Sequence, residues 1–205
     1  MGTPRFDPPV TLTGRWVRLV PLLLEQVPEL ARAGADPEIW TYMRTGQPKG
    51  EAGMRAAVQF LLDEQREGLV LAFSQQLLDG GALVGMTRYL DINRSDASVE
   101  IGGTWLNPRY RRTPVNTESK RLLLAHAFDE EGVHRVQLKT DLRNLRSQRA
   151  IERIGAQREG VLREHLRLPD GTMRSSVYYS ILASEWPAVR DRLDAFLARP
   201  WPAGT

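Results

Sequence analysis

The order of apolar and polar positions along the chain predicts a sheet flanked by helices. Alternating or continuous apolar runs predict strands, and these runs are Trp16–Val20, Leu69–Gln76, Ala82–Leu90, Ser98–Leu106, Arg135–Thr140, Gly160–Leu168 and Ser175–Leu182. Helical spacing and capping residues predict helices over Leu24–Ala33, Asp36–Met43, Glu51–Arg66, Glu118–Phe128, Asn144–Ile154 and Glu185–Leu197. Hairpins surround one strand–helix–strand crossover. We therefore expect an α/β fold (α+β mixed) with a central mixed, mostly antiparallel sheet of about seven strands and helices on both faces.

The ends of the chain are rich in Pro, Gly and Thr. We expect residues 1–9 and 199–205 to form flexible tails around a single domain of residues 10–198. The longest early apolar run, Leu19–Leu24, is interrupted by Pro21 and is too short for a membrane span or a signal peptide. This pattern predicts a cytoplasmic protein without a membrane partner.

The composition narrows the possible chemistry. There is no cysteine, which excludes disulfides, thiolate metal sites and a cysteine nucleophile. All but three of the 28 basic residues are arginine, but the net charge of +3 is too small for a dedicated nucleic-acid binder. The histidines, His126, His134 and His165, lack the spacing of metal ligands, so we expect no metal site. His165 is an alternative candidate for a catalytic base.

The segment from Ser98 to Phe128 has the layout of an anion-binding site. An apolar strand ends at Asn107-Pro108, a polar turn with three arginines follows, and a long helix is predicted to start at Glu118. The first turn of a helix has free N–H groups and the positive end of the helix dipole, and arginines add charged donors. The segment is therefore a candidate phosphate site, although many such junctions bind nothing.

A second segment, Asn144–Gly155, has the pattern of a capped helix. Asn144 is a plausible N-cap whose side chain can also reach a ligand. Ser147 shares one helix face with Ile151 and Ile154. Its hydroxyl could therefore either satisfy backbone N–H groups or face a ligand.

Together these two segments resemble the GNAT superfamily of acetyl-coenzyme A-dependent N-acetyltransferases, and within it the ribosomal-protein N-terminal alanine acetyltransferases. The family's pyrophosphate loop, R/Q-x-x-G-x-G/A, corresponds to Arg111–Asn116. The subgroup's later pattern of N-x-x-S followed by E-K-x-G corresponds to Asn144, Ser147, Glu152, Arg153 and Gly155. The similarity is strong over residues 98–182 and weaker back to residue 15. It implies transfer of acetyl from acetyl-coenzyme A to a primary amine of a protein N-terminus or a small molecule, without a metal.

The resemblance also implies a set of coenzyme-binding residues. They are Trp105, Leu106, Arg111, Arg112, Thr113, Val115, Asn116, Thr117, Asn144 and Ser147. The loop departs from the pattern because Pro114 replaces a glycine and Asn116 replaces Gly or Ala. Proline has no N–H, and an uncompensated loss of one such phosphate contact would weaken binding by roughly 10- to 150-fold. Neighbouring polar side chains can compensate.

The resemblance suggests candidate catalytic groups. Glu100 is the candidate base because carboxylates on this strand serve that role in several relatives, with a purely structural glutamate as the alternative. Ser147 is the candidate acid for the leaving thiolate. Other branches place a tyrosine where this chain has Ile151, so Tyr178 or Tyr179 would have to replace it unless they pack in the core.

The acceptor side is less defined. Trp40 and Arg44 lie in the early helical region that covers the acceptor site in relatives, so they are candidate substrate-binding residues, with a core role as the alternative for Trp40. Arg146, Arg149 and Arg153 form a basic stripe that is either solvated or contacts coenzyme phosphates or an acidic partner. A homodimer is compatible with the family. A catalytically weak acyl-coenzyme A sensor and a nucleic-acid-binding domain remain alternative interpretations.

Overall fold

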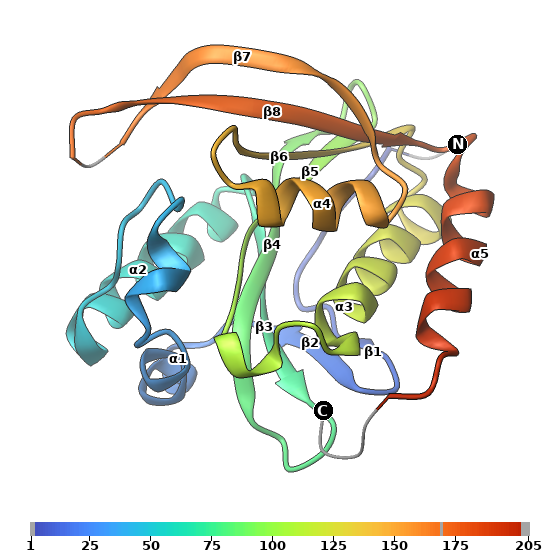
Figure 1. Ribbon diagram of the computed structural model, residues 1–205. Helices are drawn as coiled ribbons and strands as arrows, with labels where there is room; N and C mark the ends of the chain where they lie inside the picture. The colour runs from blue at the N-terminus through green and yellow to red at the C-terminus, as the bar shows by residue number, and fades with distance from the viewer. Residues whose placement is uncertain (1–2, 169, 202–205) are drawn as a thin grey trace.

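The computed structural model describes residues 3–168 and 170–201. Within these residues one eight-stranded sheet has the order β1-β2-β3-β4-β5-β6-β8-β7, and only the β5–β6 pair is parallel (Figure 1). The strands are β1 (Leu12–Thr13), β2 (Val17–Pro21), β3 (Leu71–Leu77), β4 (Leu83–Asn93), β5 (Ser98–Leu106), β6 (Arg135–Asp141), β7 (Gln157–Arg167) and β8 (Met173–Leu182). The predicted mixed, mostly antiparallel sheet is confirmed. The additional strand is the two-residue β1, which is too short to give a periodic signal.

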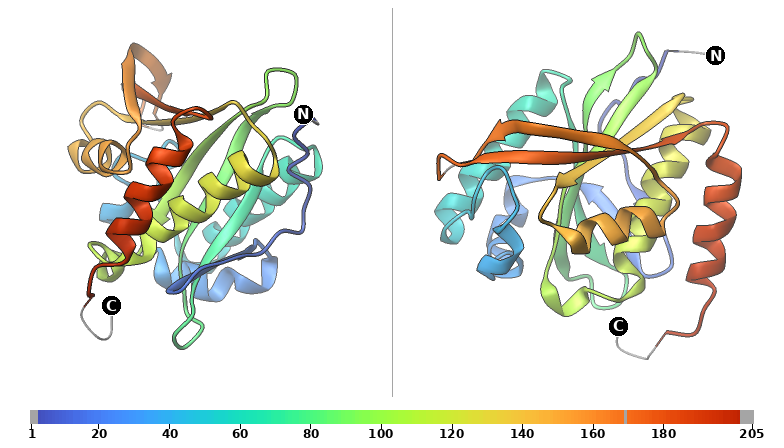
Figure 2. Two further views of the ribbon diagram at one scale, coloured as in Figure 1. Left: turned by 90° about the vertical axis from the view of Figure 1, so that its right-hand side faces the viewer. Right: turned by 45° about the horizontal axis from the view of Figure 1, so that its top comes forward.

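Helices cover both faces of the sheet, as predicted (Figures 1 and 2). The α-helices are α1 (Val27–Ala33), α2 (Gly50–Arg66), α3 (Pro114–Ala125), α4 (Leu145–Arg153) and α5 (Trp186–Leu197). Short 3₁₀ turns are η1 (Leu24–Gln26), η2 (Pro37–Trp40) and η3 (Pro108–Tyr110), and the π-helical turn η4 (His126–Glu130) continues α3. Two apolar clusters result. One packs α3, α4 and α5 against the sheet, and the other packs α1 and α2 against the opposite face.

Helix α3 begins four residues earlier than the sequence suggested. Thr113 is the N-cap, and its side-chain oxygen accepts from the N–H of Val115. Pro114 occupies the first helical position, where a missing N–H breaks no helical hydrogen bond. The prediction of a polar turn through Thr117 was therefore wrong at its end. The residues assigned to a loop instead form the first turn of the helix.

The described parts of the two predicted tails contact the domain. Phe6 is buried, with its ring 4.8 Å from that of Tyr89, and the N–H of Arg5 donates to Glu131. At the other end, Trp201 lies with its ring 5.4 Å from that of Phe196. Residues 1–2 and 202–205, which complete the predicted tails, lie outside the described residues.

Glu118 connects α3 to the first hairpin of the sheet. Its buried carboxylate accepts hydrogen bonds from three consecutive backbone N–H groups, those of Arg15 at 2.7 Å, Trp16 at 2.7 Å and Val17 at 2.8 Å. The contact requires glycine at position 14, because a Cβ there would lie 2.2 Å from the Glu118 carboxyl carbon. Glu118, predicted as the helix start, instead lies in the second turn of α3, where it holds the first hairpin.

We expect Glu118→Ala to lower the free energy of unfolding by about 3–5 kcal/mol, because one buried and two part-buried N–H groups would lose a charged acceptor. Urea denaturation at pH 7 measures this loss. Glu51→Ala, which removes an exposed glutamate from the first turn of α2, is the matched control and should cost at most about 1 kcal/mol. Equal losses in the two variants would contradict the role of Glu118.

Candidate active site

The two parallel strands at the centre of the sheet separate before they end. Paired residues of β5 and β6 run from Ser98 and Arg135 to Glu100 and Gln137. Beyond this point β5 continues along β4 to Leu106, and β6 continues along β8. Residues 102–104 of β5 are only half-buried. The backbone groups of β5 that face away from β4 are therefore available to a ligand.

A β-bulge lies on β5 at this divergence. The register shifts between the pairs Met86–Trp105 and Arg88–Gly102, so that two residues of β5 oppose one of β4. Gly103 in the bulge has φ +56°, a left-handed conformation that glycine adopts without strain. The bulge turns the backbone at the position where the strand edge is free.

Glu100 is the last residue of β5 that pairs with β6. Its carboxylate is 3% exposed, and it accepts hydrogen bonds from Lys139 Nζ at 2.7 Å and Gln137 Nε2 at 2.9 Å, both on β6. Burial raises the pKa of Glu100 even though the Lys139 ammonium acts in the opposite direction. A carboxylate with a raised pKa is a stronger base, and it is better matched to proton transfer near neutral pH.

Tyr178 and His165, both candidate catalytic residues from the sequence, lie near the Glu100–Lys139 pair. The ring of Tyr178 is 5.8 Å from Lys139 Nζ, and its hydroxyl is 3.1 Å from His165 Nε2. Burial lowers the pKa of His165, and the nearby cations of Lys139, Arg174 and Arg44 lower it further. Tyr179 is different because its side chain is fully buried and its hydroxyl donates to Glu152. The structure therefore places Tyr178 near Glu100 and gives Tyr179 a packing role.

The starts of α3 and α4 provide polar groups near the free strand edges. Asn144 caps α4, with its side-chain oxygen accepting from the N–H of Ser147 at 3.1 Å. The Ser147 hydroxyl is half-buried and has no hydrogen-bond partner among the described residues. Asn116, in the first turn of α3, is also half-buried. Helix α3 follows β5 after the turn η3, and α4 follows β6 after a short loop, so the N-terminal N–H groups of both helices lie at the same end of the sheet.

One carboxylate links the predicted phosphate loop to the start of α4. Glu38 Oε1 is 2.7 Å from an Arg111 guanidinium nitrogen and 2.6 Å from one of Arg146. These two arginines lower the pKa of Glu38, with Arg146 contributing most. Arg111 is thus already paired, and a phosphate group would have to share it with Glu38. Arg112 is exposed in a left-handed conformation with φ +61°.

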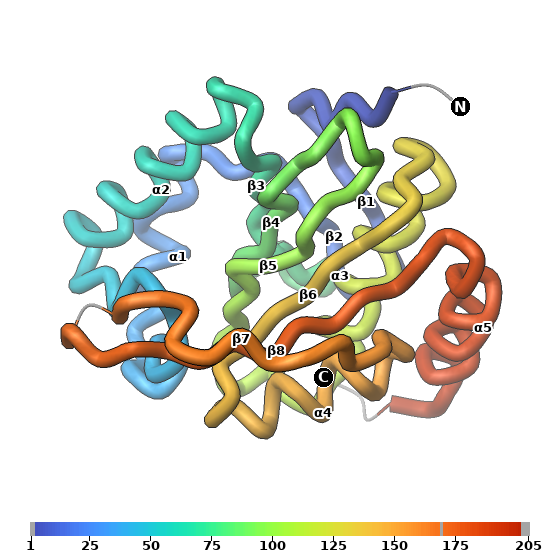
Figure 3. Tube along the Cα trace, turned by 90° about the horizontal axis from the view of Figure 1, so that it is seen from above, coloured from blue at the N-terminus to red at the C-terminus, as the bar shows by residue number. Residues whose placement is uncertain are grey.

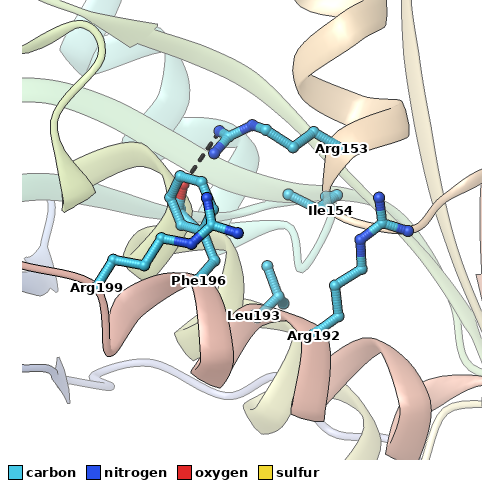
Figure 4. A pocket seen from close by; sticks show the side chains of 7 residues that line it. Arg153, Ile154, Arg192, Leu193, Phe196 and Arg199 are labelled. Atoms are coloured by element: carbon cyan, nitrogen blue, oxygen red, sulfur yellow. Dashed lines mark hydrogen bonds between the residues drawn. The ribbon is translucent and has the colours of Figure 1, made fainter.

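A basic cavity of about 160 Å³ lies where α3, α4 and α5 meet (Figure 4). Arg153 donates to Thr117 Oγ1 at 3.1 Å, and its guanidinium carbon lies 4.4 Å from the ring centre of Phe196. Arg199 lies 5.1 Å from the same ring centre, and Arg192 also lines the cavity. No ion pair engages these three arginines in the described part of the chain. Two cations over an aromatic ring and a third on the cavity wall suit an anionic ligand.

Several predicted contact residues have buried side chains. Trp105, Leu106 and Val115 belong to the two cores, so any ligand contact at these positions would use the backbone. Trp40 is also a core residue, with its ring 5.3 Å from that of Trp105 and its indole N–H bonded to the Gly34 carbonyl. Its alternative core role is therefore the one the structure supports. Arg44 is exposed on the segment after η2.

Some site residues were not found from the sequence. Gln137 and Lys139 contact Glu100, and Arg192, Phe196 and Arg199 line the cavity. Lys139 could have been singled out from the sequence, because it is one of only three lysines and lies on a predicted strand. The residues on α5 and Arg199 just after it gave no such signal, because the segment has the pattern of an ordinary amphipathic helix.

Lys120 is a second ionisable group at the bulge, on the α3 side of the sheet. It is 7% exposed, and its Nζ donates to Thr104 Oγ1 at 2.7 Å. Thr104 in turn shares a 2.8 Å hydrogen bond with Thr87. No carboxylate lies within ion-pair distance of Lys120 among residues 3–168 and 170–201. Burial lowers the pKa of Lys120 to about 7.

We expect the stability of the wild-type chain to rise with pH between about 7 and 10.4. In this window the unfolded chain holds a proton on Lys120 that the folded chain has released, which favours the folded state as pH rises. Lys120→Met should be more stable than wild type at pH 7 and should lack this part of the rise. Chemical denaturation across the pH range measures both. Parallel stability curves for the two proteins would show that Lys120 is not held in this way.

The described residues hold neither a membrane-spanning helix nor a metal cluster. Residues 3–168 and 170–201 contain no helix long and apolar enough to cross a membrane. The same residues contain no group of three or more His, Cys, Asp or Glu side chains that could hold a metal ion.

Comparison with known proteins identifies the class. Residues 17–157 match the family model of the acetyltransferase (GNAT) domain. The chain therefore belongs to the GNAT acetyltransferase family, and it is an enzyme of the N-acetyltransferase class. The family resemblance noted from the two sequence segments is confirmed. The free edge of β5 and the helix starts beside it thus belong to an acyltransferase fold.

Relatives with solved structures share almost the whole fold. A GCN5-related N-acetyltransferase from Brucella melitensis is 29% identical with a TM-score of 0.88, over 96% of this chain and 90% of that one. A "putative acetyltransferase" from T. thermophilus is 41% identical with a TM-score of 0.83, over 93% and 98% of the chains. Mycobacterium smegmatis RimJ, solved with CoA-disulfide, is 22% identical with a TM-score of 0.80 over 95% and 98%, which shows likeness of fold alone.

A curated relative matches a shorter region. The "Putative ribosomal N-acetyltransferase YdaF" of Bacillus subtilis (strain 168) is 33% identical over 110 residues, which are 54% of this chain. The chain spans 59% of the length of YdaF, and about half the length of two further B. subtilis relatives, at 48% and 50%.

Proposed function

We propose that this enzyme uses acetyl-coenzyme A and transfers its acetyl group to a primary amine held on the Glu100 side of the sheet. The observation that carries the proposal is the end of β5–β6 pairing at Glu100 and Gln137, with the starts of α3 and α4 at the same end of the sheet. A thioester arm can lie along the free edge of β5. Its carbonyl would then be beside a buried carboxylate.

The phosphate end of the coenzyme fits the helix start and the cavity. The first turn of α3 offers N–H groups to a pyrophosphate, without one from Pro114. The cavity beside it, with Arg153, Arg192, Arg199 and Phe196, suits a phosphorylated adenosine group. These arginines compensate for the engagement of Arg111 with Glu38. The proposed coenzyme site therefore depends on α5 as well as on the family loop.

Glu100, the β5 bulge and Ser147 can each serve one step of acetyl transfer. Acetyl-coenzyme A supplies an acetyl group activated as a thioester. Glu100 accepts the proton that the amine loses as its nitrogen bonds to the carbonyl carbon, directly or through a water. Free N–H groups at the bulge of β5 stabilise the negative charge on the carbonyl oxygen. When the C–S bond breaks, the Ser147 hydroxyl relays a proton from solvent water to the leaving thiolate, and the proton held by Glu100 is released to solvent.

We expect Glu100→Gln to lower kcat/KM by about 10²- to 10⁴-fold, because the amide cannot accept the amine's proton. Release of free thiol from acetyl-coenzyme A with a panel of amines measures the rate. In the wild-type enzyme kcat/KM should fall toward acid pH, with a midpoint above the usual pKa range of glutamate, because burial raises the pKa of Glu100. This fall should disappear in the variant. A variant rate within threefold of wild type would remove Glu100 from the mechanism. Coenzyme binding without thiol release from any amine would instead favour an acyl-coenzyme A sensor.

We expect Arg153→Gln to weaken coenzyme A binding by about 10-fold, because one charged donor to a phosphate is lost. Calorimetry with coenzyme A and with 3′-dephospho-coenzyme A measures the effect. The loss should be smaller for the dephospho form if the cavity holds the 3′-phosphate. Arg190→Gln on α5, whose side chain does not line the cavity, is the matched control. Equal affinities of Arg153→Gln and wild type would place the adenosine group elsewhere.

A further inference from the structure

The face of the sheet that carries Glu100 has more cations than carboxylates. Glu100 and Asp91 both pair with Lys139, at 2.7 and 3.4 Å, and the buried carboxylate of Asp141 pairs with Arg143 at 2.8 Å. Arg44, Arg88 and Arg174 lie on the same side, and no carboxylate is within ion-pair distance of them in the described part of the chain. The mechanism proposed above uses none of these three arginines.

Arg88 lies directly over the bulge of β5. It is on β4 opposite Gly102, and a Cβ at Gly103 would be 2.6 Å from one of its guanidinium nitrogens. The absence of a side chain at Gly103 is therefore what makes room for the guanidinium. Its Nε is buried without a hydrogen-bond partner. A guanidinium in this state is costly to the folded protein unless an anion reaches it.

The other cations act on the same space. Burial lowers the pKa of Arg88; the carboxylates of Glu64, Glu100 and Asp91 act in the opposite direction, and the charge of Arg44 lowers it further. Arg174 is 7% exposed, and it donates to the backbone oxygen of Tyr42, two residues before Arg44. Figure 3 shows how this contact arises, because the β7–β8 hairpin reaches across to the segment after η2. Arg174 thus holds the segment that carries Arg44.

A positive field of this kind selects among amines. A simple amine is protonated at neutral pH and would be repelled by arginines that have no carboxylate within ion-pair distance. An amine that carries a carboxylate brings the missing negative charge. A carboxylate also matches the fork of donors that a guanidinium presents. Its binding would leave the amine on the side of Glu100, near the bulge.

We propose that the acceptor is an amine bearing a carboxylate, which Arg88 and Arg44 bind, so that the substrate is an α-amino acid or a peptide whose first residue is Asp or Glu. This inference rests on the proposed acetyl transfer and names its substrate class. Arg88 binds the carboxylate next to the reacting carbonyl. Arg44 closes over it from the segment after η2.

Matched acid and amide acceptors test the inference. The probes are Asp- and Asn-initiated tetrapeptide amides, Glu- and Gln-initiated ones, and three α-amino acids with their carboxamides. We expect kcat/KM for at least one acid to exceed that of its amide by about 10- to 100-fold, and the preference to fall at high salt. Both Arg88→Gln and Arg44→Gln should reduce the acid-to-amide ratio of kcat/KM to below threefold. Arg88→Lys, which keeps the charge, should retain part of it.

Controls separate this inference from the proposed function. Arg190→Gln on α5 should keep the wild-type acid-to-amide ratio of kcat/KM. Thermal unfolding identifies any variant that has lost its fold. Because Arg44 is exposed, its variant tests the inference even if Arg88→Gln does not fold. Acids and amides acetylated equally, a ratio unchanged in Arg44→Gln, or acetylation of uncharged amines alone would overturn the inference and leave acetyl transfer intact. An absence of thiol release with every amine would instead overturn the proposed function.

Discussion

The site depends on one structural constraint, the early end of hydrogen bonding between the parallel strands β5 and β6. Pairing stops at Glu100 and Gln137, although both strands continue for several residues. Backbone groups that lose a strand partner need another, and a ligand arm can supply it. Because a helix follows each strand, the same divergence brings the starts of α3 and α4 to one end of the sheet. Ligands of open α/β sheets bind at such divergence points.

Buried charges lie on both sides of this divergence, and they have different partners. On the α2 side, Glu100 is held by Lys139 and keeps a raised pKa. On the α3 side, Lys120 has the Thr104 hydroxyl as its one side-chain partner in the described part of the chain, and its pKa is lowered to about 7. Both arrangements reduce stability relative to well-packed apolar side chains. Such costs are common at functional sites, where perturbed groups serve chemistry rather than folding.

Local patterns predicted the elements better than the contacts between them. The bounds of β5 were predicted correctly as Ser98–Leu106, because its apolar run is bounded by Asn107-Pro108. The start of α3 was missed, because the run of polar residues before Glu118 suggested a turn where Thr113 and Pro114 form a helix cap. The pairing of Arg111 with Glu38 spans 73 residues and leaves no local signal. The core position of Trp40 likewise depends on packing against Trp105, which no spacing rule shows.

A crystal structure with a non-hydrolysable acetyl-coenzyme A analogue would test the central claim most directly. We expect the pantetheine arm to lie between β5 and β6 beyond Glu100, with its thioester carbonyl at the bulge near Gly103. The pyrophosphate should contact the first turn of α3. A pantetheine arm bound outside this divergence, or β5 and β6 paired continuously past Glu100 with ligand present, would contradict the claim.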